Sequence, residues 1–175
     1  MNKQTNAAEG NHSDQIIKQI VAIWASRNKA FSDFFNKYPN EEYLKSIAPG
    51  KNRSVYLLGH LIAVNDGMIP LFGLGERLFP ELEDFVSKPD NTFEIEVTMN
   101  ELKSKWEKLN VTLSDFFNKM TTADWMDRHT TVSVEEFSKE PHRNKLNVLL
   151  GRTNHQSYHL GQLNFLVAKE AIHHN

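Results

Sequence analysis

The stretch from Thr98 to Met120, TMNELKSKWEKLNVTLSDFFNKM, is the part of the chain that decides the fold class. Its apolar residues follow one another at steps of three and four, which is the period of an α-helix with one buried face. It opens on Thr98-Met99-Asn100-Glu101, a capping box in which the threonine and glutamate side chains bond the first free backbone N–H groups. The stretch therefore predicts a long amphipathic helix that begins near residue 99.

The same helical period recurs in three further segments, residues 13–39, 52–72 and 141–169. Pro141 can occupy the first turn of the last segment, because proline lacks the N–H that this turn leaves free. Residues 80–97 show no sustained period and exceed the usual loop between neighbouring helices. We therefore expect an all-α protein, a four-helix bundle with a long connection between helices 2 and 3.

The segment before the last helix, residues 125–141, is ambiguous. Residues 130–134 have weak strand character, because threonine and valine favour extended backbone. Ser133-Val134-Glu135-Glu136 also fits the cap of a short helical turn. The sequence leaves both interpretations open.

The length of the chain, 175 residues, predicts one domain that buries about 70% of its unfolded surface. Residues 1–12 are polar and small, and we expect a flexible N-terminus there. Residues 13–175 then form the single domain. The N-terminus lacks the apolar run of a signal peptide, and no stretch approaches about 18 uninterrupted apolar residues. We expect no membrane partner.

The charge and the cysteine content narrow the classes of function. The net charge of −2 gives no reason to expect a nucleic-acid partner, which normally requires a basic surface. The chain contains no cysteine, which excludes disulfides, thiolate metal ligands and a cysteine nucleophile. A cytoplasmic location fits these features.

Two histidines four residues apart, His155 and His159, stand one turn apart on a single face of the last predicted helix. Two imidazoles at this spacing can chelate one divalent ion. His60 is the best candidate for a third ligand. By helical-wheel arithmetic, each of the three lies roughly 90° to 130° from the centre of its apolar stripe, beside the core. On spacing alone, however, a surface or helix-capping role is the commoner reading of such a pair.

A glycine, Gly161, lies inside the predicted last helix, where it costs about 1 kcal/mol relative to alanine. Its position suggests the close approach of another element or of a ligand. Tight packing between helices explains it equally well.

The pattern of Gly59-His60-Leu61 followed by His155-x-x-x-His159-x-Gly161-Gln162-Leu163 resembles the DinB-like superfamily of metalloenzymes. The resemblance covers most of the chain, including the order of the four helices. It implies that His60, His155 and His159 bind a divalent transition metal, with zinc or nickel as the first candidates.

Family members with assigned activity are mostly thiol-dependent, and include low-molecular-weight thiol S-transferases and a mycothiol-dependent isomerase. The resemblance therefore implies a transferase that activates a low-molecular-weight thiol at the metal and acts on a small-molecule substrate. By proximity, the side chains that could hold the outer ring nitrogens of the histidines are Tyr56, Asn65, Asp66, Arg152 and Gln162.

Two other functions stay open from the sequence. One is a metal-dependent hydrolase, in which Asp66 is the candidate general base. The other is a non-catalytic, stress-related bundle that forms a homodimer and whose metal is structural or absent.

Overall fold

Helices make up the regular structure of the protein. The computed structural model describes the backbone of residues 2–172 and the side chains of residues 12–166. The described chain contains no β-strand, so the prediction of an all-α protein is confirmed. The long helices are α1 (Asn2–Phe35), α2 (Ser54–Asp66), α5 (Met99–Phe117) and α8 (Lys145–Ile172). The short ones are η1 (Asn40–Leu44), α3 (Met68–Leu71), η2 (Pro80–Leu82), α4 (Asp84–Ser87), α6 (Thr122–Met126) and α7 (Val134–Lys139).

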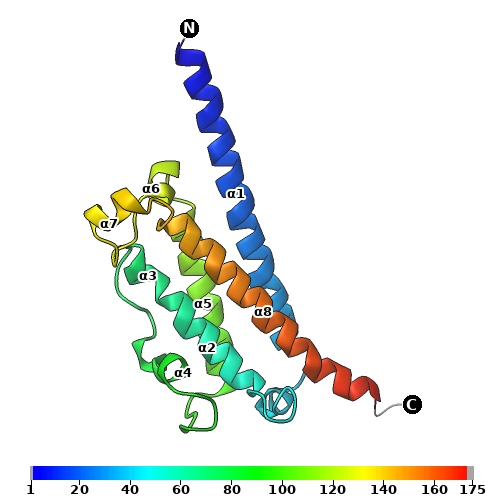
Figure 1. Cartoon of the computed structure of the whole chain (residues 1–175). Coiled ribbons are helices and arrows are strands. Elements are labelled where there is room, and N and C mark those ends of the chain that lie inside the picture. The colour runs from blue at the N-terminus through cyan, green and yellow to red at the C-terminus, as the bar shows by residue number, and fades with distance from the viewer. Residues whose placement is uncertain (1, 173–175) are drawn as a thin grey trace.

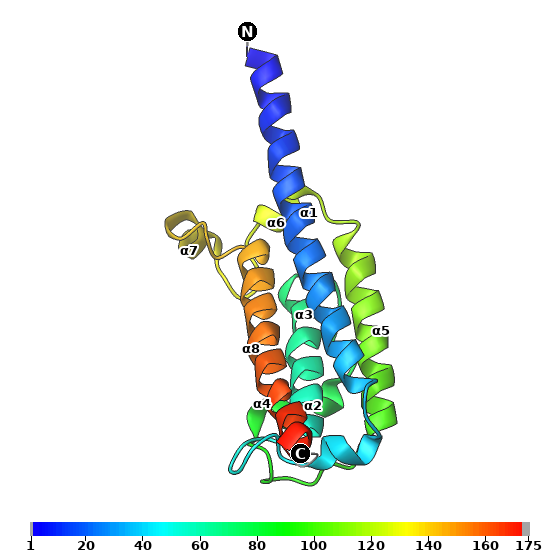
Figure 2. The same cartoon turned by 90° about the vertical axis from the view of Figure 1, so that its right-hand side faces the viewer.

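The four long helices lie side by side (Figures 1 and 2). Helix α1 packs against α8 and α5, and α2 packs against α5 and α8. The short helices α6 and α7 lie at one end of this arrangement, and α4 lies beside α2 towards the other end (Figure 1). Helices α2 and α8, which are far apart in the sequence, are thereby placed in direct contact.

Helix α2 is the central helix of the core, and every one of its residues except His60 is buried. A window that runs from Ser54 to Leu71 is long and apolar enough to cross a membrane by composition, but 78% of it is buried inside the molecule. Burial on all sides explains this composition, because a helix surrounded by other elements is apolar all round. His60 is thus the one residue of α2 whose side chain is partly exposed to solvent.

The capping signals in the sequence mark helix starts correctly in two places. Thr98 and Glu101 form the capping box at the start of α5, and Ser133 and Glu136 form the one at the start of α7. The strand interpretation of residues 130–134 is therefore wrong. Helix α1 begins at Asn2, earlier than the periodicity indicates, while the expected flexibility of residues 1–12 stays a prediction.

The predicted start of the last helix at Pro141 is also wrong. Helix α8 begins at Lys145, where the side-chain oxygen of Asn144 accepts the backbone N–H of Asn147 at 2.9 Å. An asparagine at this position satisfies a free N–H of the first turn, as helix caps do. Pro141 lies in the preceding turn, and its carbonyl accepts a hydrogen bond from the Asn144 amide.

An ion pair fastens the connection between α2 and α5 to the start of α2. The side chain of Asp90 is only 1% exposed. It accepts hydrogen bonds from the guanidinium of Arg53 at 2.6 Å and from the backbone N–H of Arg53 at 2.7 Å. It also accepts the backbone N–H of Asn91 at 2.8 Å. One buried carboxylate therefore holds both the turn and the helix start in place.

We expect Asp90→Ala to lower the free energy of unfolding by about 3 kcal/mol, because it leaves the Arg53 guanidinium and two backbone N–H groups without their acceptor. Denaturant titration measures the change. Asp33→Ala is the matched control, because it breaks an ion pair with Lys29 in which both side chains are mostly exposed. That control is expected to cost less than about 1 kcal/mol. Equal effects of the two substitutions would contradict the assigned role of Asp90.

Candidate metal centre

His60 on α2 meets His155 and His159 on α8 where the two helices pack together. The Nε2 atom of His155 lies 3.4 Å from that of His60 and 2.8 Å from that of His159. Ring nitrogens of all three residues lie within 4.8 Å of one another, which is close enough to hold a metal ion. His159 is buried, and the other two are half-buried. The sequence prediction that these three histidines come together is confirmed.

Hydrogen bonds to the outer ring nitrogens fix which atoms of His60 and His159 can act as ligands. The Nδ1 atom of His60 lies 2.8 Å from the backbone carbonyl of Phe85, which can only accept, so His60 carries its proton on Nδ1. The Nδ1 atom of His159 likewise faces the side-chain oxygen of Gln162 at 2.7 Å. Both rings therefore present an Nε2 lone pair to the centre of the cluster. The prediction that Gln162 holds the outer ring nitrogen of one of the histidines is confirmed.

The donor set fits a divalent transition metal. Two nitrogens bound to one tetrahedral ion at about 2.0–2.1 Å lie about 3.4 Å apart, which matches the separation of His60 and His155 but exceeds the 2.8 Å between His155 and His159. The Nδ1 atom of His155 is buried and has no hydrogen-bond partner among the described residues. Without a metal, the Nε2–H of His155 therefore donates to Nε2 of His159, and binding of an ion requires that this proton move to Nδ1. Three imidazole ligands leave coordination positions free, as in catalytic sites.

Gly59 explains how the carbonyl of Phe85 reaches His60. A Cβ atom built on Gly59 would lie 2.3 Å from the ring of Phe85, so only glycine lets α4 approach α2 this closely. The ring of Phe85 is itself held between Tyr56 and Phe93. Gly59 thus permits the close contact of α4 with α2, and this contact places the carbonyl of Phe85 where it orients the ring of His60. Helix α4 spans too few residues to show a period, so the sequence predicts neither this helix nor the contact of Phe85 with His60.

The remaining predicted neighbours have different roles. Tyr56 stacks on the His60 ring with 6.0 Å between centroids, and its hydroxyl donates to the carbonyl of Lys88. Asn65 is fully buried, and its amide makes no hydrogen bond within the described residues. Both carboxylate oxygens of Asp66 accept backbone N–H groups, from Leu78 and Phe79. Asp66 also lies about 9 Å from His60 along the helix axis. It closes the turn after α3 and is not directed at the histidines.

The prediction of a close approach at Gly161 is wrong for the protein itself. A Cβ atom at this position would meet no atom of another element within 4 Å among the described residues, and Gly161 is exposed. Neither tight packing between helices nor a neighbouring element explains the glycine.

Burial of the cluster lowers the pKa of each histidine. Desolvation lowers the pKa of His155 to about 4, and the neighbouring charges of His159, His60 and Arg152 act in the same direction. Desolvation also lowers the pKa of His60 and of His159, although their bonds to Phe85 and Gln162 oppose it. All three imidazoles are therefore neutral at pH 7, which is the form that binds metals.

These pKa shifts predict that the metal-free protein loses stability as the pH falls from about 6.5 towards 4. In that range the unfolded chain takes up protons on its histidines, near the ordinary pKa of about 6.5, while the folded protein does not. Above about pH 7 the effect vanishes. Denaturant unfolding of wild type and of His155→Ala across pH 5–7 tests this, since His129, whose pKa burial also lowers, contributes equally in both. Identical pH slopes in the two proteins would refute it.

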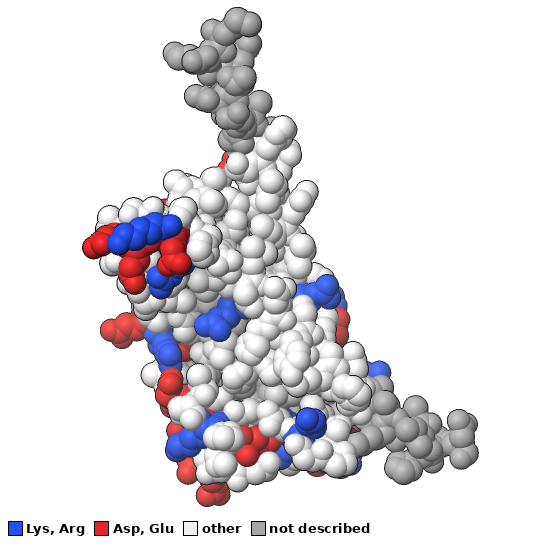
Figure 3. Space-filling view, in the orientation of Figure 1, with Lys and Arg blue, Asp and Glu red and all other residues white. Residues whose placement is uncertain are grey.

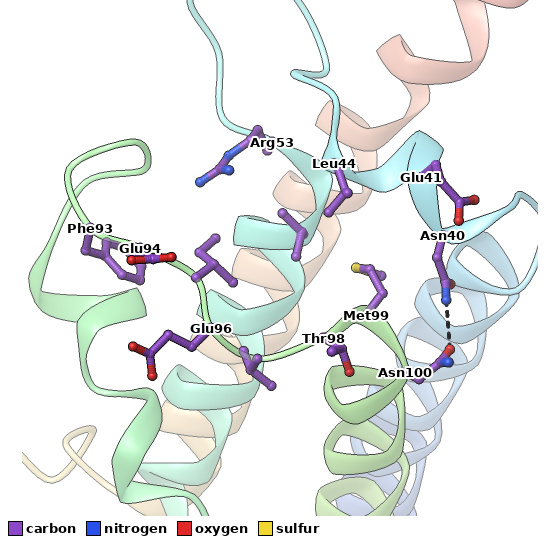
Figure 4. Close-up of a pocket in the computed structure, with 13 residues that line it drawn as sticks. Asn40, Glu41, Leu44, Arg53, Phe93, Glu94, Glu96, Thr98, Met99 and Asn100 are labelled. Atoms are coloured by element: carbon purple, nitrogen blue, oxygen red, sulfur yellow. Dashed lines mark hydrogen bonds between the residues drawn. The ribbon is translucent and has the colours of Figure 1, made fainter.

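A separate cavity of about 570 Å³ lies at the start of α2, between η1, residues 93–98 and the first turn of α5 (Figure 4). Arg53 and Leu44 lie on one side of it, and Asn40 and Asn100 are joined by a hydrogen bond of 2.8 Å at another. None of the three histidines lines this cavity. Phe93 lines it and also contacts Tyr56, so aromatic rings separate the cavity from His60.

Comparison with known proteins adds no assignment: no protein-family model and no curated protein matches the chain. The candidate site rests on its own geometry.

Proposed function

We propose that this protein is a metal-dependent enzyme of the DinB-like kind, a four-helix bundle in which His60, His155 and His159 hold a divalent ion. Within this proposal, the reaction is transfer to or from a low-molecular-weight thiol. The observation that supports it best is the convergence of three imidazole nitrogens from two helices, two of them with a fixed tautomer. These two fixed tautomers leave the Nε2 atoms of His60 and His159 free of a proton, as metal ligands must be.

A bound divalent ion would lower the pKa of a coordinated thiol and supply a thiolate nucleophile at neutral pH. The residues of the chain prepare the site for it. Phe85 and Gln162 hold the rings of His60 and His159 in the ligand orientation, and Tyr56 supports His60 from one face. Partial exposure of His60 and His155 leaves the cluster open to solvent on one side.

The hydrolase alternative lacks a general base in the described site. Asp66, the candidate from the sequence, uses both carboxylate oxygens to bind backbone N–H groups. The described metal cluster contains histidines alone, without a carboxylate. Thiol transfer therefore agrees better with the geometry.

Elemental analysis of the purified protein, together with titration of the metal-free protein with Zn²⁺ and Ni²⁺, tests the proposal. We expect one metal ion per chain and binding well below micromolar concentration. A screen of thiol conjugation beside ester and amide hydrolysis then ranks the two reactions. The proposal fails if the protein contains no metal and binds none at micromolar concentration.

A further inference from the structure

An arginine without a partner lies beside the three histidines. Arg152 precedes His155 by three residues and His159 by seven, so all three share one face of α8. Its Nε atom is buried and has no hydrogen-bond partner, and the guanidinium forms no ion pair with any described residue. Nine of the 17 other Lys and Arg side chains within residues 12–166 pair with carboxylates, and Arg152 is the one Lys or Arg of this range that has a buried nitrogen without a hydrogen-bond partner.

The charge of Arg152 acts on two of the three histidines. Desolvation is the main cause of the lowered pKa of His60 and His155, which lie on different helices, and the charge of Arg152 acts in the same direction on both. Along the axis of α8 the Arg152 residue is about 4.5 Å from His155 and about 10.5 Å from His159. On α8, Arg152 therefore lies nearer to His155 than to His159.

No acidic side chain of the described residues pairs with Arg152, and desolvation alone lowers the pKa of its guanidinium. Acidic side chains gather over α7 and around α4, while the surface along the middle of α8 shows few of them (Figure 3). The buried Nε–H of Arg152 is costly, because this donor loses water without gaining an acceptor among the described residues, while the rest of the half-buried guanidinium stays within reach of a ligand. Such a cost is typical of functional sites, where the missing partner is a ligand.

We infer that Arg152 is the anchor for a carboxylate on the substrate or on the thiol that reacts at the cluster. The guanidinium presents a planar fork of donors that matches a carboxylate in two parallel hydrogen bonds. A ligand held in this way would direct its thiol to the open positions beside His60 and His155. Binding of the thiol at the cluster rests on the proposed metal site, whereas binding of the carboxylate by Arg152 does not.

The first test compares the affinities of three small thiols for the cobalt-loaded protein. Binding is measured from the cobalt–thiolate absorption band. We expect 3-mercaptopropionate to bind at least about tenfold more tightly than 2-mercaptoethanol, and cysteamine to bind most weakly. Arg152→Met keeps the alkyl chain and is expected to remove this preference with unchanged cobalt content. Arg143→Met, which removes an arginine paired with Glu136 and Glu140, is the matched control and is expected to keep it.

Each outcome decides the inference. It is overturned if wild type shows no preference, if Arg152→Met keeps the preference, as metal chelation by the carboxylate would produce, or if Arg143→Met loses it as well. Failure to bind cobalt would instead sink the proposed function.

If the protein does not bind cobalt, a measurement on the metal-free protein tests whether Arg152 binds a carboxylate. Sodium propionate at 100 mM is expected to raise the melting temperature of wild type by about 2 °C over sodium chloride of equal ionic strength, and that of Arg152→Met by no such amount. Equal shifts in the two proteins overturn the inference.

Discussion

His155→Ala is expected to weaken metal binding by more than about 100-fold, because it removes the ligand that lies between the other two. Loss of a supporting residue alone typically costs 10- to 100-fold, so loss of a ligand costs more. The metal-free variant should melt within about 4 °C of wild type, since His155 is half-buried and its Nδ1 atom bonds no described residue. A fold that depends on this side chain would collapse instead.

The measurement is the melting temperature with and without Zn²⁺. At a metal concentration about 1,000 times the dissociation constant, wild type gains roughly 8–16 °C, and the variant gains none. His142→Ala is the matched control, because His142 is an exposed histidine that precedes α8. If His155→Ala keeps the full metal-induced shift, the three-histidine site is not where the ion binds.

Gly59→Ala is the second large effect, and we expect it to affect both the fold and the site. The added Cβ would overlap the ring of Phe85, which also packs against the rings of Tyr56 and Phe93, so a shift of Phe85 disturbs these contacts too. Overpacking of this kind costs about 1–3 kcal/mol. Displacement of α4 also removes the acceptor for the Nδ1–H of His60, so metal affinity should fall by about 10- to 100-fold.

Gly161→Ala is the matched control for Gly59→Ala, because the same substitution is made in a second helix that carries histidines of the cluster. The new Cβ meets no atom of another element within 4 Å in the part of the chain that the structure describes, so the better helix propensity of alanine should raise stability by up to about 1 kcal/mol. Denaturant titration and metal titration of the two variants are compared. Opposite signs in stability are expected, and a loss of stability at Gly161 would show that the space beside it is not free.

Prediction from the sequence succeeded where the signal was local or periodic. The steps of three and four in residues 98–120, with the capping box at Thr98 and Glu101, identified α5 and its start correctly. It failed for short helices such as α4, which spans too few residues to show a period. It also failed at the start of α8, where Asn144, and not Pro141, caps the helix.

The sequence by itself determined that the protein is all-α and that His155 and His159 share one face of a helix, because both follow from the spacing of residues along a single helix. The meeting of His60 with this pair was a prediction from the resemblance, and the packing of α2 on α8 brings it about. Only the tertiary structure decided that Phe85 orients the ring of His60 and that the buried Nε of Arg152 has no hydrogen-bond partner among the described residues. The physical reason is that these features depend on how α2, α4 and α8 pack, and packing between distant segments leaves no period in the sequence.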